Sequence, residues 1–148
     1  MFEASGIIKY SPPRQIDSKW WLTIEVLNFE DTASYYRSLI DKNWIEADTS
    51  TIKRKYSRPP HPPHISIIRG EKPRKNLDQW GKYKANQKVN FLYSNKLRQT
   101  NLKVDGKDYF WFIDTVYEDY NKIRRFFGLN TSRNGVDFRG HITIARVY

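Results

Sequence analysis

The same six-residue pattern occurs twice in this chain. His64-Ile65-Ser66-Ile67-Ile68-Arg69 is the first copy, and His141-Ile142-Thr143-Ile144-Ala145-Arg146 is the second. In both copies β-branched residues alternate with polar ones over a short run, which is typical of a strand with one buried face rather than of a helix. The sequence therefore predicts two related strands, each beginning with a His.

Side chains two residues apart on a strand share a face. His64 and Ser66 are therefore expected on one face of the first strand, and His141 and Thr143 on one face of the second. Ring and hydroxyl would lie roughly 7 Å apart along a strand, about the span of a phosphate held by two groups. Because His both takes and gives protons near neutrality, two such strands side by side would form a candidate acid–base site.

Each pattern ends in an arginine, Arg69 or Arg146. Strict alternation places both guanidinium groups on the isoleucine face, where pairing with a carboxylate would be an ordinary structural role. Because Gly70 follows Arg69 and allows the chain to turn, Arg69 is also a candidate phosphate contact. The third histidine, His61, lies among prolines and is predicted to be structural or exposed.

The chain is strongly basic and rich in aromatic residues. Its net charge is +10, and aromatic residues make up 16% of it. The charge favours a polyanionic partner, and the rings favour nucleobases because bases stack on them. The segment 94–108 is polar and basic, which predicts a mobile flap with Arg98 as its phosphate contact.

The sequence has no Cys, which excludes a disulfide framework, a thiol nucleophile and Cys-ligated metal centres. Its three His have no carboxylate cluster beside the motifs, so we expect neither a metal nor another cofactor. Without a long apolar run or a leader pattern, we expect a cytoplasmic protein with no membrane contact and no obligatory protein partner.

At 148 residues the chain is expected to form a single domain, 1–148. Hydrophobic periodicity predicts two β-α-β halves that each close on a His strand. The expected elements are strands at 20–26, 64–69, 89–93, 109–115 and 141–146, helices at 31–43, 77–83 and 118–127, and loops at 46–63 and 130–140.

Paired His-x-Ser/Thr strands define the 2H phosphoesterase superfamily, which this chain resembles over most of its length. The resemblance implies an α+β, bilobal 2H phosphoesterase fold, in which two pseudo-symmetric β-α-β lobes with antiparallel sheets form a central cleft. It also implies that His64 and His141 are the catalytic acid and base, with Ser66 and Thr143 binding the phosphate. Ser66 stands where the superfamily more often has Thr, and the hydroxyl chemistry is the same.

The chain is similar in particular to the phage anti-CBASS phosphodiesterases. The stretches 6–10, 64–74 and 110–114 carry this likeness, together with Trp20 and Trp21. It implies a metal-independent hydrolase of 3′–5′ bonds in cyclic di- and trinucleotides such as 3′,3′-cGAMP, acting in the cytoplasm of an infected bacterium. Tyr10 and Trp111 would then be the candidates for stacking on the bases, although such rings also fill small cores.

The mechanism expected for such a substrate uses one neutral imidazole to deprotonate the 2′-hydroxyl and one protonated imidazole to donate to the departing 5′-oxygen. Which His is the base is left open by the sequence. Three alternatives also stay open: an RNA-end enzyme acting on 2′,3′-cyclic phosphates or 2′,5′ linkages, a non-catalytic module binding single-stranded RNA, and a phage structural protein in which the strands merely pack.

Overall fold

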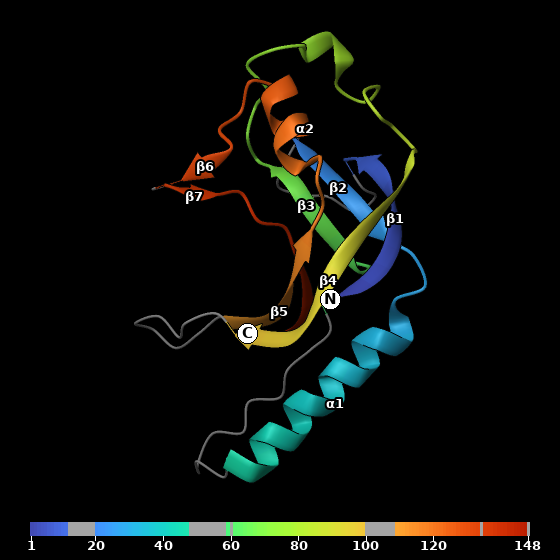
Figure 1. Ribbon diagram of the computed structural model, residues 1–148, viewed down its shortest axis with the longest axis vertical. Helices are drawn as coiled ribbons and strands as arrows, with labels where there is room; N and C mark the ends of the chain where they lie inside the picture. The colour runs from blue at the N-terminus through green and yellow to red at the C-terminus, as the bar shows by residue number, and fades with distance from the viewer. Residues whose placement is uncertain (12–19, 48–58, 60, 100–108, 134, 148) are drawn as a thin grey trace.

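The computed structural model describes residues 1–11, 20–47, 59, 61–99, 109–133 and 135–147. Figure 1 shows the path of the chain through these residues. In chain order the elements are β1 (Phe2–Tyr10), β2 (Trp21–Val26), α1 (Glu30–Ala47), β3 (His64–Arg69), the short 3₁₀ helix η1 (Leu77–Gln79), β4 (Lys88–Gln99), β5 (Tyr109–Val116), α2 (Tyr120–Phe126), β6 (Ser132–Arg133), β7 (Val136–Asp137) and β8 (His141–Val147).

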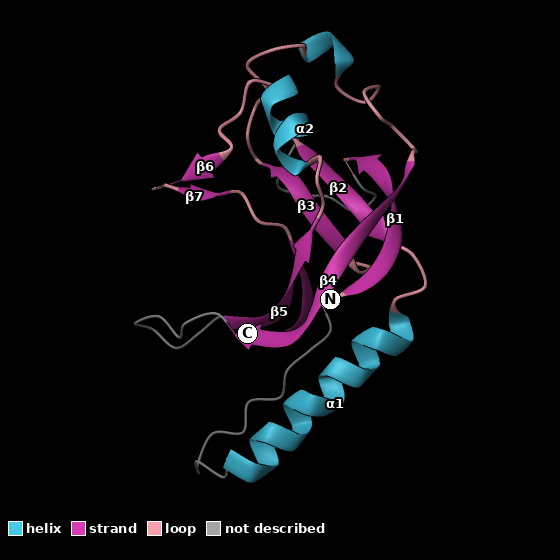
Figure 2. Cartoon of the chain, in the orientation of Figure 1, coloured by secondary structure: helices cyan, strands magenta, loops and turns pink. Residues whose placement is uncertain are grey.

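Six strands close into a barrel in the order β1-β2-β3-β8-β5-β4. Every neighbouring pair in this ring is antiparallel. Figure 2 shows the two α-helices at opposite ends of the strand array. The prediction of an α+β fold with antiparallel strands is therefore confirmed.

The two halves of the chain have the same connectivity. The first half runs β1-β2-α1-β3 and the second runs β4-β5-α2-β8, with the β6–β7 hairpin inserted before β8. Within each half the middle strand pairs with both others, and the halves join where β3 meets β8 and β1 meets β4. Each helix packs against the His strand of the opposite half, α1 against β8 and α2 against β3.

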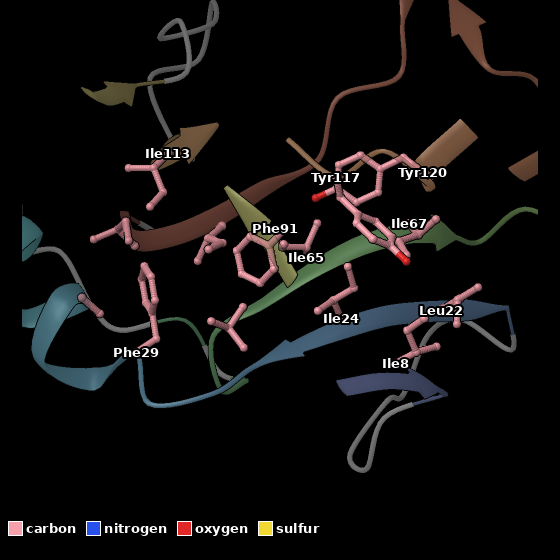
Figure 3. Close-up of a cluster of buried hydrophobic side chains, with 14 of the residues drawn as sticks. Ile8, Leu22, Ile24, Phe29, Ile65, Ile67, Phe91, Ile113, Tyr117 and Tyr120 are labelled. Atoms are coloured by element: carbon pink, nitrogen blue, oxygen red, sulfur yellow. The ribbon is translucent and has the colours of Figure 1, made fainter. Parts of the chain in front are cut away.

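The barrel interior is built from the alternating apolar residues of the strands. Figure 3 shows the β1 and β2 side chains meeting those of β3, with Phe29 near α1 and Tyr120 at the other end of the cluster. Burying each isoleucine contributes about 1.5–3 kcal/mol. The fully buried isoleucines of this core are Ile8, Ile24, Ile40, Ile65, Ile67, Ile68, Ile113, Ile123, Ile142 and Ile144.

The elements differ from the predicted ones at several places. β1 was not predicted, and the helix expected at 77–83 forms only the 3₁₀ helix η1, followed by turns. α1 continues to Ala47 because no Gly or Pro interrupts it. β4 continues to Gln99 through an irregularity in its pairing with β5, where the Lys96 N–H donates to Ser94 Oγ over 3.0 Å. The predicted flap therefore begins as strand, and its part at 100–108 lies outside the described residues. Part of the predicted loop at 130–140 forms the β6–β7 hairpin.

Gly140 allows a close approach beneath the second motif. A Cβ at this position would lie 2.6 Å from Cζ of Tyr120 and 2.7 Å from Cγ2 of Ile65. The Gly140 carbonyl accepts a hydrogen bond from the Thr115 N–H over 3.0 Å, so the backbone is tied in place. Only glycine fits here without displacing the strand that carries His141.

We predict that Gly140→Ala destabilises the protein by about 1–3 kcal/mol, the usual cost of overpacking a core. Urea unfolding measures this. Gly81→Ala is the control, because a Cβ at Gly81 meets nothing within 4 Å and the substitution costs only its positive φ of 86°. A Gly140→Ala protein as stable as the Gly81→Ala protein would contradict the proposed clash.

Candidate active site

The pairing of β3 with β8 brings the two motifs together. Ile65 lies opposite Ile142 in this antiparallel ladder. In this register His64 lies opposite Thr143 and Ser66 opposite His141, so the two imidazoles are diagonal neighbours on one face. Their side chains are half-buried, whereas both isoleucines are fully buried on the opposite face. The four residues predicted from the repeated pattern therefore share one outer face of the barrel.

His64 is held through one ring nitrogen. Its Nδ1 lies 2.8 Å from the carbonyl oxygen of Pro62. Because a carbonyl only accepts, the ring donates from Nδ1, and in the neutral ring Nε2 keeps its lone pair. Burial lowers the pKa of His64, His61 and Arg69 lower it further, and only the Pro62 hydrogen bond opposes them. This environment favours the neutral ring, which is the form of a proton acceptor.

His141 has different neighbours. Asp114 of β5 lies directly opposite it in the ladder. The Phe110 ring stacks on the imidazole with centroids 5.7 Å apart, and the Phe112 ring meets it at 5.2 Å. Burial lowers the pKa of His141, whereas the Asp114 carboxylate acts to raise it and Arg69 to lower it. The net effect still lowers the pKa of His141, and the nearby carboxylate distinguishes His141 from His64 because it opposes part of the effect of burial.

Trp21 organises the side of the site nearest β2. Its Nε1–H donates to Ser66 Oγ over 2.8 Å. The indole has no acceptor, so the Ser66 hydroxyl accepts here and its own proton stays available for a ligand. The buried Trp21 ring also meets the His64 ring at 5.1 Å and the His61 ring at 5.0 Å.

Sequence reasoning did not identify Trp21 as a site residue. The available signal was its place in the β2 alternation, where Trp21 and Thr23 fall on the polar face opposite Leu22 and Ile24. A large aromatic residue on the polar face of a strand needs something to cover it. Here the covering groups include the first motif and His61, which was predicted to be only structural or exposed.

A β-bulge reverses the expected direction of Arg69. Thr23 pairs with Ser66 and Leu22 pairs with Ile68, so Ile67 is an extra residue in β3. One extra residue shifts the alternation, so Arg69 lies on the imidazole face and not on the isoleucine face. Its guanidinium carbon lies 5.2 Å from the Trp21 ring centroid. The expectation from strict alternation is therefore wrong for Arg69.

The second motif has a matching bulge. Phe112 pairs with Thr143 and Trp111 pairs with Ala145, which leaves Ile144 as the extra residue. The extra residue places Arg146 on the same face as His141, just as the bulge in β3 places Arg69 on the same face as His64. The two His strands therefore have a β-bulge at the same position of the motif, in addition to their similar sequences.

A buried arginine satisfies the carbonyl freed by each bulge. Arg37 Nε of α1 donates to the Ile144 oxygen over 3.2 Å, and Arg124 Nη1 of α2 donates to the Ile67 oxygen over 2.8 Å. Buried carbonyls without a partner cost about 1–3 kcal/mol each. Each helix thus supports the irregular point of the His strand that it covers.

The other predicted ligand contacts lie in different surroundings. Arg98 is on β4, where Nη1 contacts Asp114 Oδ2 at 2.7 Å and the guanidinium carbon lies 5.3 Å from the Phe112 centroid. Arg98 therefore contacts Asp114, the residue that lies opposite His141, and Asp114 stands between Arg98 and the imidazole. Trp111 is 6% exposed and packs in the core, so its ring faces away from the imidazoles.

Tyr10 also packs elsewhere. Its ring meets the Trp80 ring edge-on at 4.9 Å, and its hydroxyl donates to the Tyr83 carbonyl over 2.5 Å. Burial raises the pKa of this hydroxyl. The structure therefore places Tyr10 in an aromatic cluster with Trp80 and Phe127, and the rings that flank His141 are Phe110 and Phe112 instead.

Comparison of the chain with models of known protein families, with curated proteins and with solved structures finds no match. Among the residues that the structure describes, no three His, Asp or Glu side chains are grouped so as to hold a metal ion. No helix in this described part of the chain is long and apolar enough to cross a membrane. The chemistry of the site is therefore inferred from its own geometry.

We predict that Asp114→Asn lowers the pKa of His141 further and leaves that of His64 unchanged, because Asp114 acts on His141 alone. NMR titration of the His ring resonances measures both values. Asp119→Asn is the control, since that carboxylate pairs with Lys84 away from both imidazoles. An unchanged or raised His141 pKa in Asp114→Asn would contradict this electrostatic account.

Proposed function

We propose that this protein is a metal-independent phosphodiesterase that cleaves 3′–5′ bonds of cyclic di- and trinucleotides. The supporting observation is the antiparallel pairing at Ile65 and Ile142, which places two imidazoles and two hydroxyls on one face. Two acid–base groups and two hydrogen-bond donors are what cleavage beside a 2′-hydroxyl requires. The two halves, β1-β2-α1-β3 and β4-β5-α2-β8, would correspond to the lobes of a 2H fold, with this face as the cleft.

The surroundings of the two imidazoles suggest their roles. His64 Nε2 removes the proton of the 2′-hydroxyl while the 2′-oxygen attacks phosphorus. His141, protonated beside Asp114, donates its proton to the 5′-oxygen as the P–O5′ bond breaks. The products are a 2′,3′-cyclic phosphate and a free 5′-hydroxyl. Water then opens the cyclic phosphate with the two roles exchanged, leaving a 3′-phosphate.

The remaining groups stabilise the charge that develops on the phosphoryl oxygens. The Ser66 proton is directed by the bond from Trp21, and the Thr143 hydroxyl makes no side-chain hydrogen bond to the residues that the structure describes. Arg69 adds a positive charge that reaches both imidazoles. Donors that are already oriented before reaction need little reorganisation in the transition state, which makes such a site effective.

Charge and rings support a nucleotide substrate. The net charge of +10 attracts polyanions, and Phe110 and Phe112 beside His141 offer faces on which a base could stack. In the cytoplasm of an infected bacterium, this activity would destroy the cyclic-nucleotide signal of CBASS and let a phage evade that defence. RNA-end processing is the second candidate, because the same face would act on a 2′,3′-cyclic phosphate.

We expect purified protein to consume 3′,3′-cGAMP or a cyclic trinucleotide in the presence of EDTA, with products followed by chromatography. RNA ending in a 2′,3′-cyclic phosphate is the parallel substrate. Cleavage of that RNA alone would favour the RNA-end enzyme. Binding of single-stranded RNA without turnover of any substrate would contradict the proposal and favour the non-catalytic module.

We expect His64→Ala and His141→Ala each to reduce turnover by about 10²–10⁴-fold. A ribonucleoside 3′-(4-nitrophenyl phosphate) separates their roles, because nitrophenolate leaves without being protonated. Its cleavage should recover in His141→Ala and stay low in His64→Ala. Recovery in His64→Ala alone would reverse the assignment of base and acid.

We expect Trp21→Phe to lower kcat by about 2–10-fold with little change in KM, because it removes one hydrogen bond that orients Ser66. Trp20→Phe is the matched control, since the Trp20 ring packs edge-on against Trp80. In a Ser66→Ala background, Trp21→Phe should have little further effect on kcat. Fully additive losses would show that Trp21 acts only through packing.

A further inference from the structure

A hollow of about 860 Å³ adjoins the candidate active site through Arg69. It lies between the end of β3, the helix α2 and the β6–β7 hairpin, which projects from the barrel in Figure 1. Its volume is within the range of about 300–1,000 Å³ that small-molecule sites occupy. The residues that line it are Arg69, Glu71, Arg124, Asn130, Thr131, Ser132, Val136, Asp137, Phe138 and Arg139.

The floor of this pocket is already fixed. Arg124 is 5% exposed and donates to both Glu71 carboxylate oxygens at 2.9 and 2.8 Å. It also donates to the Asn130 carbonyl at 2.7 Å, and its guanidinium carbon lies 4.7 Å from the Phe138 ring centroid. Because its charge is balanced by Glu71, Arg124 is a structural support for the pocket, not a free anion contact.

Two other arginines on the wall are not neutralised. Within the described residues, neither Arg69 nor Arg139 forms an ion pair. Between them the wall offers the Asn130 amide, the hydroxyls of Thr131 and Ser132, and the ring of Phe138. Guanidinium groups bind phosphate, and amide and hydroxyl groups bind base edges, so this combination fits a nucleotide.

The pocket also lies at a defined end of the site. Arg139 precedes His141 by two residues, and Arg69 follows Ser66, which faces His141 across the ladder. The pocket is therefore beside His141, the proposed acid, rather than beside Pro62 and the Nδ1 side of His64. His141 protonates the departing 5′-oxygen, so the pocket adjoins the leaving-group side of the substrate.

Resting on the proposed function, we infer that this pocket binds the nucleotide that carries the leaving 5′-oxygen. Arg139 and Arg69 contact the next phosphate of that nucleotide, and its base lies against the β6–β7 wall. The enzyme then recognises at least two nucleotide units, one on each side of the scissile phosphorus.

Arg139→Ala tests this inference, with kcat/KM measured for two substrates. The cyclic dinucleotide has a leaving nucleotide, whereas the ribonucleoside 3′-(4-nitrophenyl phosphate) has none. We expect kcat/KM for the dinucleotide to fall about tenfold or more, chiefly through KM, and that for the nitrophenyl ester to stay unchanged. Arg125→Ala is the matched control, because it removes one exposed arginine of α2 that does not line the pocket.

A second variant changes the pocket wall that the β6–β7 hairpin forms. Val136 is 56% exposed on the hairpin, so Val136→Glu adds a negative charge without disturbing the core, and it should produce the same selective loss. If both variants lower kcat/KM equally for the two substrates, or lower it for neither, the pocket assignment is wrong while the proposed function stands. If the unmodified protein cleaves neither substrate, the proposed function fails and this inference fails with it.

Discussion

The pairing of Ile65 with Ile142 is the constraint on which the rest of the site depends. Side chains alternate along a strand, so a slip of either strand by one residue would turn its imidazole into the barrel and its isoleucine into water. Both isoleucines are fully buried, and exposing each would cost about 1.5–3 kcal/mol. The hydrophobic core therefore sets the register of the polar face, and Gly140 provides the space in which the two His strands approach.

The two-fold connectivity explains how an irregular pair of strands is stabilised. A bulge frees one backbone carbonyl in each His strand, at Ile67 and at Ile144. Arg124 and Arg37 reach across from the helix of the opposite half and bond to these carbonyls. Since each half completes the hydrogen bonding of the other, neither motif strand is fully satisfied without the whole chain. The bulges in turn direct Arg69 toward the imidazoles.

The two His motifs have similar sequences, but the fold surrounds their imidazoles with different groups. His64 has a backbone carbonyl on Nδ1 and an indole against its ring, whereas His141 has a carboxylate opposite and two phenylalanine rings. Burial lowers the pKa of both. The Asp114 carboxylate opposes this at His141, whereas at His64 the Pro62 hydrogen bond opposes it and His61 adds to it. A pseudo-symmetric scaffold thus gives its two imidazoles different surroundings, and the proposed reaction would use this difference because proton removal and proton donation need different partners.

The sequence by itself determined the two His strands, the face that His64 shares with Ser66 and His141 with Thr143, and the approximate positions of α1 and α2, because these follow from local periodicity. The helix expected at 77–83 forms only the short 3₁₀ helix η1. The α+β class with antiparallel strands was implied by the resemblance that the paired motifs carry, not by periodicity. Only the tertiary structure decided the direction of Arg69, the hydrogen bond from Trp21 to Ser66 and the burial of Trp111. A bulge depends on the register of a neighbouring strand, and a hydrogen bond or a buried ring depends on residues remote in the chain, none of which periodicity records.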